Sequence, residues 1–183
     1  MSTTQQQIGM TTWQIDPAHS EIGFSVKHMM VTTVRGRFQN FAARIELNEQ
    51  DPAQSKISVE IDVASVDTRE QQRDDHLRSA DFFDVANHPT MTFVARNAER
   101  VSGDRYRVVG DLTIRGVMRE VVLDAEITGR GKDPWGGERL GVSATTRINR
   151  GDYGLKWNVA LETGGILVAE EVKINLEVQL IRK

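Results

Sequence analysis

Strict alternation of polar and apolar residues marks the segment Glu171-Val172-Lys173-Ile174-Asn175-Leu176-Glu177-Val178-Gln179-Leu180, close to the end of this 183-residue chain. A period of two places every apolar side chain on one face of a strand and every polar side chain on the other. The segment is therefore predicted to be a half-buried β-strand, with one face in a core and the other in water.

The same alternation recurs along the chain, in residues 20–28, 34–47, 56–63, 90–95, 105–115, 120–128 and 140–148. In 34–47 the phase slips between Phe38 and Phe41, which indicates a β-bulge or a bend. Glycine-containing turns at 102–104 and 115–116 and loops at 48–55 and 131–137 separate the runs. About eight strands in an antiparallel meander are expected.

One segment breaks the alternation. Thr68-Arg69-Glu70-Gln71 fits a capping box, with Thr68 as the cap. A short helix over residues 69–80 is expected to follow, and its few apolar positions are insufficient for a core element. We expect the helix near one end of the sheet, with Phe82 and Phe83 pointing into it.

Strands with one apolar face must bury those faces against one another, because a single short, polar helix cannot cover an open sheet. A sandwich and a closed barrel both satisfy this requirement, and closure also removes the exposed strand edges. At eight strands, a barrel is either just filled by its own side chains or holds one small ligand. Both interiors stay open at this point, since a flattened barrel packs well with the same residues.

Composition excludes several classes of function. The formal net charge is −3, which argues against nucleic acid or an anionic membrane as the main partner. The absence of cysteine removes disulfides, thiolate metal sites and a cysteine nucleophile. No apolar run is long enough to span a bilayer, so stable membrane insertion is not expected. Residues 1–11 are expected to form a loose tail, and residues 12–183 are expected to form one domain. The tail lacks the features of a signal peptide, which favours a cytoplasmic location unless a signal was removed.

Several motifs occur in a specific order and spacing, namely Trp13-Gln14-Ile15-Asp16-Pro17-Ala18-His19-Ser20, Ile22-x-Phe24-x-Val26-x-His28, Gly36-Arg37-Phe38, Arg73-Asp74-Asp75-His76-Leu77-Arg78-Ser79-Ala80-Asp81-Phe82-Phe83-Asp84, His88-Pro89, Gly110-Asp111-Leu112-Thr113-Ile114-Arg115-Gly116-Val117, Arg150-Gly151-Asp152-Tyr153-Gly154 and Val172-Lys173-Ile174. Together they resemble the YceI-like family of lipid-binding proteins, from about Trp13 to the C-terminus. The resemblance implies an all-β, lipocalin-like, antiparallel eight-stranded barrel with a helix near one mouth. It also implies a polyisoprenoid or similar long-chain amphiphile in the lumen, in a homodimer, and it names no catalytic residue.

The inward strand faces are the candidate contacts for a lipid tail. They comprise Ile22, Phe24, Val26, Phe38, Ile57, Val59, Ile61, Met91, Phe93, Leu112, Ile114, Val121, Leu123, Val142, Ile174 and Leu176. Phe82 and Phe83 would form either a lid or a plug that anchors the helix. Trp157 would flank the opening or pack as an ordinary core residue.

Polar candidates are fewer. His28 continues an apolar face, where it would bond to a ligand head group or to Asp152, or be satisfied within the core. Four arginines lie near strand ends, namely Arg35, Arg37, Arg115 and Arg119. If two of them converged, they could bind a diphosphate through paired hydrogen bonds. Solvated arginines are the alternative.

The four histidines form no metal-binding motif, and the sequence contains neither a Gly-x-Ser-x-Gly motif nor a phosphate-binding loop. Together with what the resemblance to the YceI-like family implies, this leads us to expect a non-enzymatic protein that binds, stores or transports a long-chain isoprenoid or fatty lipid, with no cofactor and no metal. Two alternatives stay open, namely a barrel enzyme acting on an isoprenoid-like substrate and a packed interaction module without a ligand.

Overall fold

The structure, a computed structural model, describes residues 9–162 and 164–183. Its strands are β1 (Met10–Ile15), β2 (Glu21–His28), β3 (Thr32–Phe38), β4 (Phe41–Asn48), β5 (Lys56–Asp62), β6 (Val66–Asp67), β7 (Thr90–Ser102), β8 (Arg105–Ile114), β9 (Val117–Lys132), β10 (Glu138–Asn149) and β11 (Val168–Arg182). The expected domain boundary at residue 12 falls inside β1, and residues 1–8 of the expected tail lie outside the described residues.

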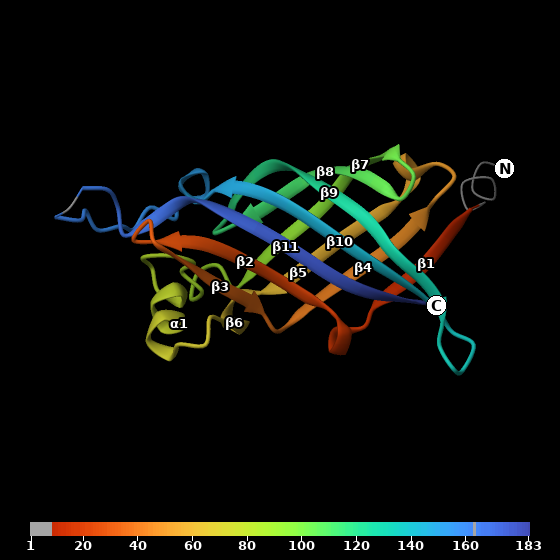
Figure 1. The fold of residues 1–183 in the computed structure, drawn as a ribbon, viewed down its shortest axis with the longest axis horizontal. Coiled ribbons are helices and arrows are strands. Elements are labelled where there is room, and N and C mark those ends of the chain that lie inside the picture. Colours follow the sequence, from red (N-terminus) through yellow and green to blue (C-terminus); the bar gives the residue numbers. More distant parts are fainter. Residues whose placement is uncertain (1–8, 163) are drawn as a thin grey trace.

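All described strands belong to one antiparallel sheet, which closes on itself because β11 pairs with β1 and with β2 (Figure 1). Three pairs of short strands, β1 with β2, β3 with β4 and β5 with β6, each act as one long interrupted strand. The interruptions are a 3-10 turn at Pro17–His19, the break at residues 39–40, and a 3-10 turn at Val63–Ser65. Counted in this way, the described residues form the expected closed barrel of eight strands.

The slip in alternation between Phe38 and Phe41 corresponds to the break between β3 and β4. Strand β1 was not expected. It pairs with β4 through Trp13 and Ile45 and with β11 through Ile15 and Leu180, so it supplies one end of the seam that closes the barrel. Trp13, Ile45, Leu140 and Leu180 are buried together there and form the smaller of two core clusters among the described residues.

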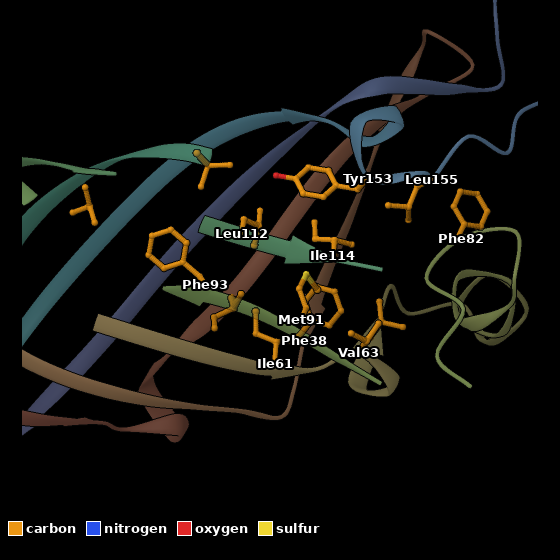
Figure 2. Close-up of a cluster of buried hydrophobic side chains, with 14 of the residues drawn as sticks. Phe38, Ile61, Val63, Phe82, Met91, Phe93, Leu112, Ile114, Tyr153 and Leu155 are labelled. Carbon is orange, nitrogen blue, oxygen red and sulfur yellow. The ribbon is translucent and has the colours of Figure 1, made fainter. Parts of the chain in front are cut away.

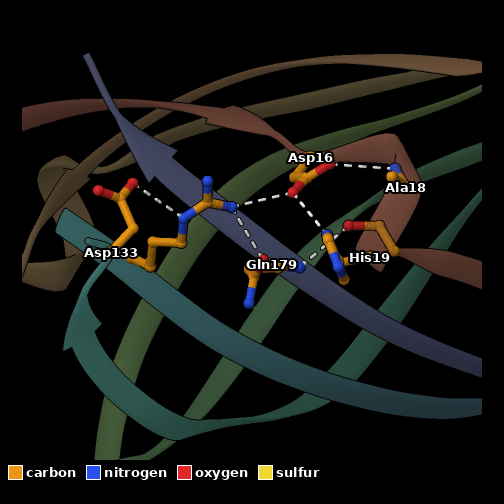
Figure 3. A network of polar contacts seen from close by, with 7 residues as sticks. Asp16, Ala18, His19, Asp133 and Gln179 are labelled. Carbon is orange, nitrogen blue, oxygen red and sulfur yellow. Dashed lines mark hydrogen bonds and ion pairs between the residues drawn. The ribbon is translucent and has the colours of Figure 1, made fainter. Parts of the chain in front are cut away.

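A polar network fastens the outside of this seam (Figure 3). Arg139 donates from Nη1 to Asp16 Oδ2 at 2.9 Å and to Gln179 Oε1 at 3.0 Å, and from Nε to Asp133 Oδ2 at 3.3 Å. The hydrogen bond with His19, and after it the one from Arg139, holds the pKa of Asp16 below its ordinary value. The network ties the turn after β1 to β10, β11 and the loop between β9 and β10.

The expected helix is present as α1 (Gln71–Arg78), at one end of the barrel (Figure 1). The expected cap was wrong. The Glu70 carboxylate, rather than Thr68, accepts from the first-turn N–H groups of Gln72 and Arg73. Thr68 is buried and engaged elsewhere, because its N–H and its hydroxyl both donate to Asp74 Oδ1, at 2.9 and 2.5 Å.

The larger core cluster lies inside the barrel near α1 and extends along it (Figure 2). Gly36 of β3 lies within this region without a side chain, and a Cβ there would stand 2.4 Å from Phe24 Cζ and 2.9 Å from Thr68 Cγ2. The Phe24 ring is held in turn against Phe38, with ring centroids 5.6 Å apart. Glycine at position 36 therefore makes the room that the Phe24 ring occupies.

We expect Gly36→Ala to lower the free energy of unfolding by about 1–3 kcal/mol, because it overpacks a tight contact. Phe24→Leu in the same chain removes Cζ and should relieve part of that loss, leaving the Thr68 contact. Urea unfolding of the two single variants and the double variant measures the coupling. Strict additivity of the two single effects would contradict the predicted contact.

Tyr153 is 2 % exposed, and its hydroxyl has no hydrogen-bond partner among the described residues. It follows β10 in a 3-10 turn (Arg150–Tyr153) and belongs to the larger cluster (Figure 2). Burial raises the pKa of the phenol to about 12, because the charged form loses its water. The hydroxyl therefore costs stability without repaying it through a bond to the protein.

Tyr153→Phe should leave the free energy of unfolding at neutral pH unchanged or raise it by about 1 kcal/mol. The folded-state pKa of Tyr153 lies above the ordinary value near 10, so folding favours the protonated phenol. The stability that this protonation contributes to the free energy of unfolding is lost as the pH rises from 10 to 12. The wild-type protein should lose up to about 3 kcal/mol more than Tyr153→Phe across that window. Urea unfolding of both proteins at several alkaline pH values measures the difference, and parallel losses would refute it.

Candidate functional site

Two neighbouring cavities occupy the barrel lumen. The first, here the helix-end cavity, has a volume of about 380 Å³ and is lined partly by α1 and partly by the barrel strands. The second, the mid-barrel cavity, has a volume of about 200 Å³ and is lined by strand residues alone, almost all apolar. Phe24, Phe38, Met91 and Ile174 line both cavities, so these side chains form the partition between them.

Every candidate tail contact lines at least one of the two cavities. The mid-barrel cavity takes Ile22, Phe24, Phe38, Ile57, Val59, Ile61, Met91, Phe93, Leu112, Val121, Leu123, Val142, Ile174 and Leu176. The helix-end cavity takes Val26, His28, Phe82, Phe83, Ile114 and Trp157 in addition to the partition. The alternation of the strands thus brings the predicted residues together in one lumen, whose occupant remains a prediction.

Aromatic side chains gather where α1 meets the barrel. The His76 ring stands edge-on to Phe82 and to Trp157, with centroids 5.0 and 4.6 Å away, and it bonds to Asp81 through Nε2 at 2.9 Å. Phe83 contacts Phe38 of the partition edge-on, at 5.9 Å. These contacts join the helix end of the lumen to its interior.

Arg150 is the most deeply placed cation of the site, at 6 % exposure. Its guanidinium donates to the backbone carbonyls of Leu155, Trp157, Val168 and Ala169, at 2.7 to 3.2 Å. Burial lowers the pKa of Arg150 because no carboxylate compensates its charge within hydrogen-bond reach among the described residues. With four of its five N–H groups engaged, Arg150 holds the loop after β10 in place and has little capacity left for a ligand.

Arg73, on the first turn of α1, is better placed to meet a polar group. Its Nε donates to Thr68 Oγ1 and its Nη2 to Thr68 O, each at 2.7 Å. Its Nη1 has no partner among the described residues. Gln72 lines the helix-end cavity beside it. The helix therefore presents hydrogen-bond donors at the end of an otherwise apolar lumen.

None of the four arginines suggested for a head group lines either lumen cavity. Arg35 lies on an outer groove of the sheet, and Arg37 pairs with Asp67 at 3.5 Å. Arg115 and Arg119 donate to backbone carbonyls near the helix end, Arg115 to Phe82 and Gly154 and Arg119 to Asp152. The structure therefore gives no support to a diphosphate fork built from these residues.

His28 lines the helix-end cavity as expected from its strand face, but no hydrogen bond joins it to Asp152 in the described part of the chain. Gln72, Arg73 and His76 were not predicted to line the lumen, because the helix was expected to have too few apolar positions to be a core element. Their spacing could have predicted that they lie together, because residues four apart in a helix, such as Gln72 and His76, share one face.

No cluster of three or more histidine, aspartate or glutamate side chains suited to a metal ion occurs within residues 9–162 and 164–183. The one helix longer than a single turn in the described chain is too short and too polar to cross a membrane.

Comparison with known proteins identifies similar families and relatives. A family model described as the YceI-like domain matches residues 13–180. A UPF0312 protein of Staphylococcus aureus (strain MSSA476) is 39% identical over 165 residues, which cover 90% of this chain and 94% of that protein.

Solved structures agree with this placement. The YCEI protein of Campylobacter jejuni is 34% identical and superposes with a TM-score of 0.75. The match covers 92% of this chain and 96% of that protein's chain. A polyisoprenoid-binding domain from Saccharophagus degradans shares the fold at 14% identity, with a TM-score of 0.64 over 94% of this chain and 99% of that domain. The chain therefore belongs to the YceI-like family.

Proposed function

We propose that the protein binds a polyisoprenoid or a similar long-chain amphiphile in its lumen and serves as a carrier or store, without catalysing a reaction. The observation that carries the proposal is the predominantly apolar lining of two neighbouring cavities, which share the partition residues. The structural neighbour from Saccharophagus degradans is described as polyisoprenoid-binding, which supports this choice of ligand class. The expected homodimer and the cytoplasmic location stay predictions.

The physical basis is the transfer of a hydrocarbon tail out of water. At about 0.8 kcal/mol for each buried methylene, a tail of about 20 carbons carries a gross transfer free energy of roughly 16 kcal/mol. Even after binding costs of several kcal/mol, the remainder is enough for tight capture. Selectivity must then come from the length of the lumen and from the groups at its end.

The orientation of the ligand follows from the lining. The mid-barrel cavity offers almost no polar atom and suits the tail. The helix-end cavity offers the Arg73 Nη1, the Gln72 amide and the His28 imidazole, which suit an oxygen-bearing head group. A head at α1 and a tail beyond the partition is the arrangement that places the polar group of the ligand beside side chains that can bond to it.

The direct test is extraction of the purified protein with organic solvent, followed by mass spectrometry. A long-chain lipid at about one molecule for each chain is the expected result, as one lumen can hold one tail. Recovery of no lipid, together with failure of the extracted protein to rebind a polyisoprenol, would favour the packed interaction module. Chemical conversion of the bound lipid on incubation would favour the enzyme.

Filling the lumen should block binding. Val26 lines the helix-end cavity, and its neighbour Ser25 faces the outer groove of the same strand. We expect Val26→Trp to reduce the lipid recovered from each chain by about tenfold or more, since the indole occupies space that the ligand needs, and Ser25→Trp to leave it unchanged. Thermal unfolding of both variants verifies that they fold. Equal lipid recovery from the two folded variants would place the ligand outside the lumen.

A further inference from the structure

The turn between β2 and β3 has an unusual composition for its geometry. Met29 and Met30 stand at its centre with φ values of 54° and 62°, and the Val31 N–H donates to His28 O at 3.1 Å. Two successive left-handed residues are typical of a type I′ turn, which favours Asn-Gly. Left-handed φ values are unfavourable for methionine, so the backbone gains nothing from these two side chains.

The side chains at this turn are exposed. Met29, Met30 and Val31 are 47%, 68% and 78% accessible, and Val159 of the neighbouring loop is 45% accessible. We call these four residues the apolar tip. Exposed side chains of this size are normal when isolated, but a group of them at one place marks an interaction surface.

Contacts hold the two parts of the apolar tip side by side. The Met29 N–H donates to Leu167 O at 2.7 Å, and the Leu167 N–H donates to Val159 O at 3.0 Å. Figure 1 shows both loops projecting from the end of the barrel at which α1 lies. The apolar tip is thus a feature of the fold rather than of one loop.

The apolar tip adjoins the helix-end cavity. His28, which immediately precedes Met29, and Leu167, which holds Met29 by its carbonyl, both line that cavity. Met29 and Met30 are not among its lining residues. They therefore lie next to the helix-end cavity without contributing to the space that a ligand would occupy.

The charges around the apolar tip permit contact with lipid head groups. Between Glu21 and Glu46 the chain carries no acidic residue, although its net charge is −3. Lys27 lies next to the turn, and the neighbouring segment 150–170 carries Lys156 together with Asp152, Glu162 and Glu170. Apolar contact is therefore the main contribution, and attraction to anionic lipid is a smaller one.

We propose that the apolar tip docks reversibly on the surface of a lipid bilayer, which places the helix-end cavity against the membrane for lipid exchange. The exchange role rests on the function proposed above, whereas the docking itself does not. The partner is the interfacial region of a bilayer, where methionine and valine side chains leave water while the barrel stays outside. This mode needs no inserted helix and no cationic protein surface.

The turn itself supplies a sharp variant. Met29→Asn with Met30→Gly gives the turn its preferred residues, so the double variant should unfold at an equal or higher temperature than the wild-type protein. It should bind vesicles of phosphatidylcholine and phosphatidylglycerol about tenfold or more weakly in co-flotation, because two apolar side chains are lost from the contact. A matched control is Trp135→Ala. This residue is 87% accessible in the loop between β9 and β10 at the opposite end, and its removal should leave vesicle binding unchanged.

Each result has a definite meaning. Unchanged vesicle binding by the folded double variant overturns docking through the apolar tip, and loss of binding in Trp135→Ala assigns it to the other end. Sedimentation at matched concentrations is the second readout. Conversion of a dimer into a monomer by the double variant, with vesicle binding retained, identifies the apolar tip as a contact between copies instead. Binding that persists in pure phosphatidylcholine supports the apolar mode, and binding that requires phosphatidylglycerol and disappears in salt overturns it.

Lipid content is measured on the same samples, which separates the two proposals. The double variant should retain the lipid that the wild-type protein carries, because its changes lie outside the cavity lining. A protein that docks on vesicles but never carries lipid defeats the carrier function alone. A protein that carries lipid but does not dock on vesicles defeats the apolar tip alone.

Discussion

The structure depends on one strand, β11, which pairs along one edge with β10 and along the other with both β2 and β1. Residues 168–177 pair with β2, and residues 180–182 pair with β1. Without this second edge, the sheet would be open and its apolar face would lie in water, since the described chain has only the short α1 to cover it. Closure therefore creates the core and the lumen in the same step.

Closure also sets the limits of the lumen. At the β1 end of the barrel, Trp13, Ile45, Leu140 and Leu180 are buried together, whereas at the other end the lumen meets the polar side chains of α1. The two ends thus differ in chemistry although the strands between them are alike. An amphiphile in such a lumen has a defined direction, and this asymmetry carries more functional information than the fold class alone.

The sequence predicted the lumen well because a strand has a rigid period of two. Once Ile174 faces inward, Leu176 must also face inward, and both line the mid-barrel cavity. The same rule would have excluded Arg35 and Arg37, which alternate with the inward-facing Gly36 and Phe38, had parity been applied to them.

The polar end was less accessible to prediction. Arg150 bonds only to backbone carbonyls, which have no residue type to recognise in a sequence. Thr68 looked like a helix cap, yet Asp74, six residues on, draws its N–H and its hydroxyl into a buried contact, and Glu70 caps the helix instead. Contacts fixed by tertiary packing decide this region, whereas a local repeat decides the strands.

The proposed binding of a long tail in the lumen has a consequence for the rate at which the tail can leave. The larger the apolar surface that a tail buries, the slower the tail leaves for water, so affinity differences appear chiefly in the dissociation rate. A carrier that held a long tail by burial alone would be too slow to deliver it through water. Transfer becomes faster when the exit leads directly into a second apolar phase, because the tail then never crosses water and most of its transfer free energy is not lost on the way. A cavity beside exposed apolar side chains meets that requirement, whereas the end at which Trp13 and Leu180 are buried does not. Under the proposed function, tight capture in the lumen and docking through the apolar tip would thus be two consequences of the same hydrophobic transfer.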